Sequence, residues 1–134
     1  MKNYTGTKTV SAEPMNEFDA VQKGIARPNT DNHEFRDGYH VVYPDGYESW
    51  SPKDVFEEAY KCSETHIDRM KIEYQELKER INRLKDFLNS NANSIDEDEE
   101  SLLKAQSLAM CSYCSILSER LLKCLISNTD ASNQ

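Results

Sequence analysis

The chain has 134 residues, of which 37% are hydrophobic, and its 16 basic and 24 acidic side chains give a net charge of −8. A mean hydropathy of −0.80 leaves little apolar material for one isolated core, so we expect self-association into a homo-oligomer. The acidic balance excludes broad, charge-driven adhesion to DNA, RNA or an anionic membrane. We find neither a run of the roughly 20 apolar residues that span a bilayer nor a secretory leader, which predicts a soluble, intracellular protein.

A change of composition divides the chain near residue 62. All four prolines, all four glycines and the single tryptophan lie before that point, and neither proline nor glycine follows it. Proline and glycine punctuate short elements, whereas their absence favours long helices. The sequence therefore predicts an α+β fold with a small β-hairpin/helix module over 1–62, a long antiparallel two-helix hairpin over 63–127 and a disordered tail over 128–134.

Short elements are predicted at the start of the first module. Threonine and valine residues within 5–15 favour a strand that Pro14 closes. Asn16 can cap a helix of one or two turns that stops at Gly24. The following stretch, 25–37, is polar and rich in turn-forming residues, which predicts a surface loop.

The clearest local signal is a β-hairpin over 38–50. Aromatic and β-branched runs flank Pro44-Asp45-Gly46, where proline fixes φ and glycine accepts a positive φ. Ser51 can cap a following helix whose first residue is Pro52. Six side chains of the hairpin and this helix are expected to form a small core: Tyr39, Val41, Tyr43, Trp50, Val55 and Phe56.

The second half changes to the heptad period of packed helices. Seven apolar residues recur at spacings of 3 and 4: Ile67, Met70, Tyr74, Leu77, Ile81, Leu84 and Leu88. Thr65 and Asp68 resemble a capping box at the start of this helix, and the alternative is one continuous helix from Pro52. A loop over 89–93 is followed by Ser94 and Glu97, which resemble a second capping box.

The second long helix is expected from about Ile95 to about Ile126, and it carries two apolar stripes. One stripe comprises Leu103, Met110, Cys114, Leu117, Leu121 and Cys124. The adjoining stripe comprises Leu102, Ala105, Ala109, Tyr113 and Ile116. A single partner helix covers only one stripe, so we expect the other to meet a second chain or the N-terminal module. We also expect an aspartate at Leu117 to dissociate the oligomer.

Two segments resemble bacteriophage protein modules. The tract from Gly38 to Phe56, with Tyr4-x-Gly6-Thr7-Lys8 and Ala12-x-Pro14-Met15 before it, resembles the N-terminal module of many small phage proteins. That module often precedes a domain similar to the Thoeris anti-defence sponge family, but the Gly-Trp-rich core of that domain is absent here. The second half, which includes Leu77-Lys78-Glu79-Arg80 and the segment from Tyr113 to Arg120, resembles a widespread phage helical-hairpin module.

The resemblance implies a phage counter-defence protein that acts in the cytoplasm of the host bacterial cell. By analogy with oligomeric phage sponges, it would sequester a cyclic nucleotide-type immune signalling molecule at subunit interfaces, without cleavage and without a cofactor. The alternative is a non-enzymatic phage interaction protein that binds and inhibits a host protein. A third hypothesis, a phosphodiesterase-like enzyme, would require a metal site.

Basic side chains concentrate on the first long helix, and most are expected to form a solvated surface with i,i+4 ion pairs. The other interpretation is a phosphate site in which Arg69 or Lys71 lies beside Tyr113 and Arg120 of the opposing helix. Tyrosine offers a stacking face for a base, and arginine offers a fork for phosphate. These four residues are the predicted ligand-binding set, in a cleft where chains meet.

Cys111 and Cys114 form a Cys-x-x-Cys motif, and Cys62 with His66 could supply two further zinc ligands. Both cysteines of the motif also fit the apolar face of their helix, so we interpret them as core residues. The three histidines are scattered, and the acidic run after Ile95 is typical of a helix start. We therefore expect no metal site and no catalytic constellation.

Overall fold

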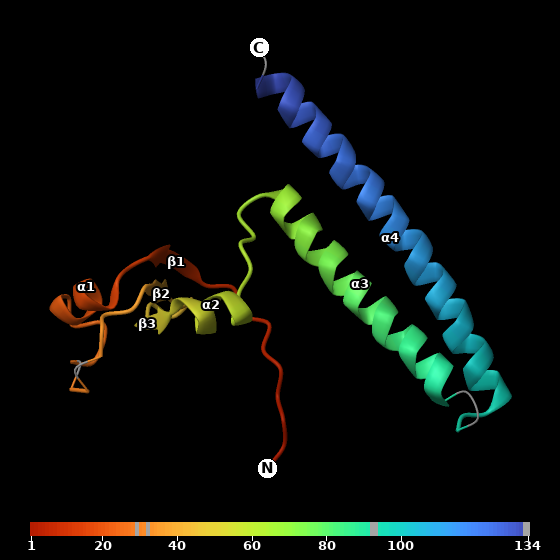
Figure 1. The fold of residues 1–134 in the computed structure, drawn as a ribbon, viewed down its shortest axis with the longest axis horizontal. Helices are drawn as coiled ribbons and strands as arrows, with labels where there is room; N and C mark the ends of the chain where they lie inside the picture. The colour runs from red at the N-terminus through yellow and green to blue at the C-terminus, as the bar shows by residue number, and fades with distance from the viewer. Residues whose placement is uncertain (29, 32, 92–93, 133–134) are drawn as a thin grey trace. The chain divides into compact units, whose positions relative to one another are not determined.

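The computed structural model describes residues 1–28, 30–31, 33–91 and 94–132, and it divides into two compact units, the second of which begins at Cys62. The first unit is a small sheet with short helices, and the second is a pair of long helices (Figure 1). The predicted α+β class is thus confirmed. The two predicted loops and the predicted tail include residues 29, 32, 92–93 and 133–134, which lie outside the described residues.

Three antiparallel strands form the sheet of the first unit in the order β1-β2-β3. They span Ser11–Pro14, Gly38–Val42 and Glu48–Pro52, so the predicted hairpin over 38–50 is confirmed. β1 is shorter than the predicted strand within 5–15. Because Ser11 already pairs with Val42, the last residue of β2, the residues before it have no strand to pair with.

Two short helices complete this unit. α1 spans Glu17–Gln22, and the Asn16 side chain accepts a hydrogen bond from the Phe18 backbone N–H at 2.9 Å, which confirms the predicted cap. Gly24 follows with φ of 74°, a left-handed conformation that ends the helix at little steric cost.

α2 spans Lys53–Ala59 and has no side-chain cap, so the predicted role of Ser51 is wrong. Ser51 and Pro52 are instead the last residues of β3, paired with Tyr39 and Gly38. The predicted core is correct except for Val55, which is 59% exposed because it lies on the outer face of α2. Five predicted core residues are buried or half-buried: Tyr39, Val41, Tyr43, Trp50 and Phe56.

The second unit is a hairpin of α3, His66–Asn91, and α4, Glu97–Ser132 (Figure 1). Thr65 and Asp68 exchange hydrogen bonds of 3.1 and 3.2 Å between backbone N–H and side-chain oxygen, which confirms the first capping box. The two helices enclose a buried cluster of Met70, Leu77, Ile81 and Leu117.

Both ends of α4 differ from the prediction. At its start, Asp96 Oδ1 accepts a hydrogen bond of 2.7 Å from the Glu99 backbone N–H, so Asp96 rather than Ser94 is the N-cap. At its end, the helix continues beyond Ile126 to Ser132, because neither proline nor glycine interrupts it.

The two apolar stripes of α4 have different environments. The first faces α3: Leu117 is fully buried, and Ser107 is buried in the same row. The second, from Leu102 to Ile116, is exposed. Leu117 is therefore part of the hairpin's own core, so we expect an aspartate there to disrupt the packing of α3 against α4 before it affects any oligomer.

Candidate functional site

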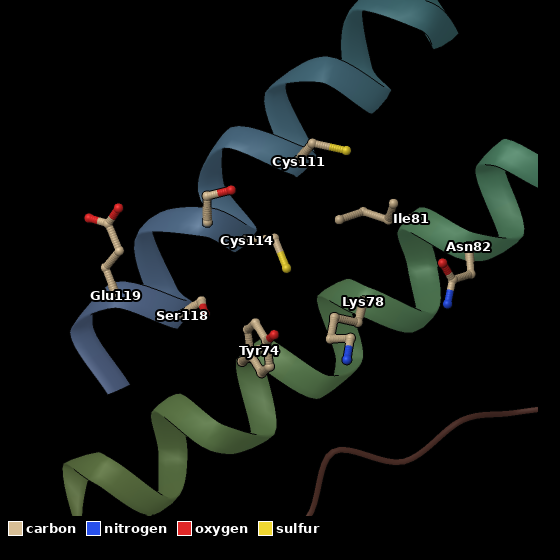
Figure 2. A pocket seen from close by; sticks show the side chains of 9 residues that line it. Tyr74, Lys78, Ile81, Asn82, Cys111, Cys114, Ser118 and Glu119 are labelled. Carbon is tan, nitrogen blue, oxygen red and sulfur yellow. The ribbon is translucent and has the colours of Figure 1, made fainter. Parts of the chain in front are cut away.

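A groove of about 520 Å³ lies along one flank of the hairpin. In Figure 2, Tyr74 and Lys78 of α3 lie opposite Cys114 and Ser118 of α4, with Ile81 close to Cys111. Nine residues line it: Tyr74, Lys78, Ile81, Asn82, Cys111, Cys114, Ser115, Ser118 and Glu119.

The groove arises from unequal side-chain sizes on the two helices. Cys111, Cys114 and Ser118 are small, so α4 does not fill the space beside the Tyr74 ring. Lys78 Nζ lies 5.3 Å from the centre of that ring, which is within the range of a cation–π interaction. The groove can therefore hold a planar group against Tyr74 with an anionic group near Lys78.

None of the four predicted ligand-binding residues lines this groove. Arg69 and Lys71 flank the buried Met70, and successive helical residues point roughly 100° apart, so the two cations lie on opposite flanks of α3. Lys71 is two helical turns before Lys78 and shares the groove flank. Arg69 lies on the other flank, where its guanidinium donates to the Ser63 carbonyl oxygen at 3.1 Å.

Tyr113 and Arg120 also lie on the flank away from the groove. Tyr113 and Ser115 lie on either side of the half-buried Cys114 in the chain, so they point to opposite flanks of α4. Because Ser115 lines the groove, Tyr113 lies on the other flank. Arg120 is two helical turns beyond Tyr113 and shares its side of α4. The hairpin thus brings Arg69, Tyr113 and Arg120 to one flank and separates Lys71 from them.

Three of the four cysteines have contacts within the second unit. Cys111 and Cys114 pack against the buried cluster of the hairpin, in agreement with their interpretation as core residues. The Cys62 thiol lies 3.5 Å from Asp68 Oδ2. Within the described ranges, no group of three or more histidine, cysteine, aspartate or glutamate side chains could hold a metal ion.

One charged cluster of the first unit was not predicted from the sequence. Glu17 is only 4% exposed, and its carboxylate accepts hydrogen bonds from the Arg36 guanidinium at 3.2 and 3.3 Å and from the Arg36 backbone N–H at 3.1 Å. His33 Nε2 lies 3.2 Å from the same carboxylate. The Arg36 side chain is the main cause that lowers the pKa of Glu17 to about 2, against the opposing effect of burial.

The groove was not predicted from the sequence either, although the pattern around Tyr74 and Lys78 indicates it. Tyr74 is the only aromatic member of the α3 seam, and Lys78 follows it by one turn. The facing segment of α4 is rich in cysteine and serine. A large ring opposite small residues indicates a gap, provided that the register of the two helices is known.

The second unit is therefore a helical hairpin with a buried core between its helices, an open groove on one flank and an uncovered apolar stripe on its longer helix. Residues 64–123, less than half of the chain, match the protein-family model described as Sequestin. The matched segment contains α3 and most of α4. No curated protein and no solved structure matches the chain. Among the described residues, no helix has both the length and the apolar character needed to cross a membrane.

Proposed function

We propose that this chain is a phage counter-defence protein that sequesters a cyclic nucleotide-type immune signalling molecule at subunit interfaces without cleaving it. The observation that carries the proposal is the match of residues 64–123 to Sequestin, a name that suggests sequestration. All four proposed ligand-binding residues, Arg69, Lys71, Tyr113 and Arg120, fall inside that segment.

The proposed contacts follow from the chemistry of one flank. Tyr113 is 42% exposed and offers a ring face to a base. Arg69 and Arg120 are exposed on the same flank and offer charged donors to phosphate. A ligand that also meets Lys71 must be shared with a second subunit, because Lys71 lies on the opposite flank. The chain's net charge of −8 does not oppose such a site, since salt screens the interaction between exposed charges beyond roughly 10 Å at ordinary ionic strength.

Binding without cleavage fits this set of residues. Arginine and lysine offer charged hydrogen-bond donors and no acceptor, tyrosine offers a ring face, and the set contains no carboxylate or histidine to act as a general base. The four side chains can therefore neutralise and stack a ligand but do not form an acid–base pair for hydrolysis.

The test is isothermal titration calorimetry of the full chain against cyclic mono-, di- and trinucleotides and cyclic ADP-ribose species. We expect at least one ligand to bind with a Kd in the micromolar range or tighter, and chromatography after incubation to recover it intact. If none binds tighter than about 100 µM, the sequestration proposal fails and inhibition of a host protein takes its place. A chemically altered ligand would instead indicate an enzyme.

A further inference from the structure

The uncovered stripe of α4 has a palindromic spacing. Seven residues from one helical face follow each other at intervals of 4, 3, 4, 4, 3 and 4, which read the same in both directions about the central alanine: Asp98, Leu102, Ala105, Ala109, Tyr113, Ile116 and Arg120. This face is distinct from the one that packs on α3. Intervals of 3 and 4 keep all seven residues on one helical face, and a two-fold symmetric pair of antiparallel helices brings residues at equal distances from the axis together.

The stripe exposes apolar side chains that a partner would cover. Leu102, Tyr113 and Ile116 are 65%, 42% and 56% exposed, respectively. Ala105 and Ala109 at the centre are small and allow two helix backbones to approach closely. From Asp98 to Arg120 the stripe is about 33 Å long, at 1.5 Å per residue.

We propose that a second copy of this chain docks on the stripe, with its α4 antiparallel and the two-fold axis at Ala109. Leu102 then packs on Ile116 of the second copy, and Ala105 lies opposite Tyr113 of the second copy. The large ring thus fills the space that the small alanine leaves, and both contacts occur twice by symmetry.

Charge fixes the direction of this pairing. The antiparallel arrangement places Asp98 of each copy beside Arg120 of the other, whereas a parallel arrangement would place aspartate beside aspartate and arginine beside arginine. In the part of the chain that the structure describes, neither Asp98 nor Arg120 has an ion pair within its own chain. Glu100, in contrast, already pairs with Lys104 at 2.9 Å.

This inference rests on the proposed function and narrows its site, because Tyr113 and Arg120 of both copies lie along the same interface whereas Lys71 lies on the opposite flank. It can be tested without a ligand, however, since it concerns the oligomeric state of the protein alone. A dimer that binds no nucleotide would overturn only the proposed function. A monomer that binds one would overturn the dimer and the placement of the ligand at a subunit interface, but not sequestration itself.

The first test is light scattering and sedimentation of the full chain and two matched variants. Ile116→Glu lies on the stripe, and Leu108→Glu alters another exposed leucine of α4 that is 73% exposed and off the stripe. We expect Ile116→Glu to raise the dimer Kd at least about 100-fold and Leu108→Glu to change it less than about threefold. Both should keep the helical circular dichroism of the parent. A monomeric parent, or equal effects of the two variants, would overturn the proposal.

The second test concerns the direction of the pairing. Arg120→Asp should raise the dimer Kd about tenfold, because it turns two attractive contacts per dimer into repulsive ones. Adding Asp98→Arg to that variant should restore the Kd to within about threefold of the parent. A double variant that dimerises no better than Arg120→Asp alone would overturn the antiparallel arrangement.

Discussion

The indole nitrogen of Trp50 donates a hydrogen bond of 2.7 Å to the backbone carbonyl oxygen of Met15. This bond links β3 to the chain just after β1, across the central strand β2. The Trp50 ring lies so close to Gly38 that a Cβ atom there would collide with the ring and with the Ser51 carbonyl oxygen. The lack of a side chain at Gly38 is therefore what lets the ring reach Met15.

Gly38→Ala is accordingly expected to destabilise the first unit by about 1–3 kcal/mol, because the ring or the strand must move. The measurement is urea unfolding followed by the fluorescence of Trp50, the only tryptophan of the chain. Gly6→Ala is the control, since a Cβ at Gly6 meets no atom within 4 Å. Equal unfolding midpoints for the two variants would contradict the prediction.

The carboxylate of Glu17 should make the first unit acid-sensitive. Its pKa is lowered from 4.5 to about 2, so its contribution to stability is complete above about pH 4.5 and is lost as the pH falls towards 2. Glu17→Gln should therefore lower the free energy of unfolding at neutral pH, and its difference from the parent should shrink between these two pH values.

Trp50 fluorescence in urea at several pH values measures this difference. Glu58→Gln is the matched control, because Glu58 is exposed and its side chain makes no hydrogen bond or ion pair among the described residues. A Glu17→Gln difference that stays constant from neutral pH to about pH 2 would show that the charge of Glu17 does not stabilise the unit.

Leu117 and Leu122 provide a second matched pair, in the hairpin. Leu117 is fully buried and Leu122 is 58% exposed. Leu117→Ala should cost about 2–5 kcal/mol of hairpin stability, whereas Leu122→Ala should cost less than about 0.5 kcal/mol. Circular dichroism during urea unfolding reports the hairpin, which holds most of the helical residues. A comparable loss for both variants would mean that the face of α4 with Leu117 is not the one that packs on α3.

The sequence was sufficient for elements with a strong repeating signal. The heptad seam from Ile67 to Leu88 predicted α3, and Pro44-Asp45-Gly46 predicted the hairpin turn, because both patterns depend only on neighbours along the chain. The exact cap residue does not follow from such a pattern. Ser94 and Asp96 both suit an N-cap, and the choice of Asp96 depends on where the chain leaves the loop before α4.

Features that join distant segments could not be predicted. The Glu17–Arg36 pair connects α1 to the end of a loop, and neither residue belongs to a local pattern. The groove depends on Tyr74 lying opposite Cys114 and Ser118, which requires the register between α3 and α4. The same limit applied to the ligand set. Arg69 and Lys71 are near in sequence, yet the rotation of roughly 100° per helical residue places them on opposite flanks of the buried Met70.

The last prediction concerns ligand binding at Arg120. If its guanidinium contacts a phosphate, Arg120→Ala should weaken binding by about 1.5–3 kcal/mol, which is roughly 10-fold to 150-fold in Kd. The measurement is calorimetry with the best-binding ligand of the panel, at a protein concentration at which light scattering shows the variant to have the same oligomeric state as the parent. Raising the salt concentration should weaken binding by the parent more than by the variant, since the variant has lost one charge contact.

Arg83→Ala is the matched control for this variant, because Arg83 is an exposed arginine of the same hairpin outside the proposed ligand set. It removes the same charge from the chain and should leave the ligand Kd within about twofold of the parent, because exposed charges beyond the contact distance are largely screened. Equal weakening by both variants would indicate a general charge effect rather than a contact at Arg120. An unchanged Kd for Arg120→Ala would remove Arg120 from the site, and the groove beside Tyr74 and Lys78 would then be the surface to test.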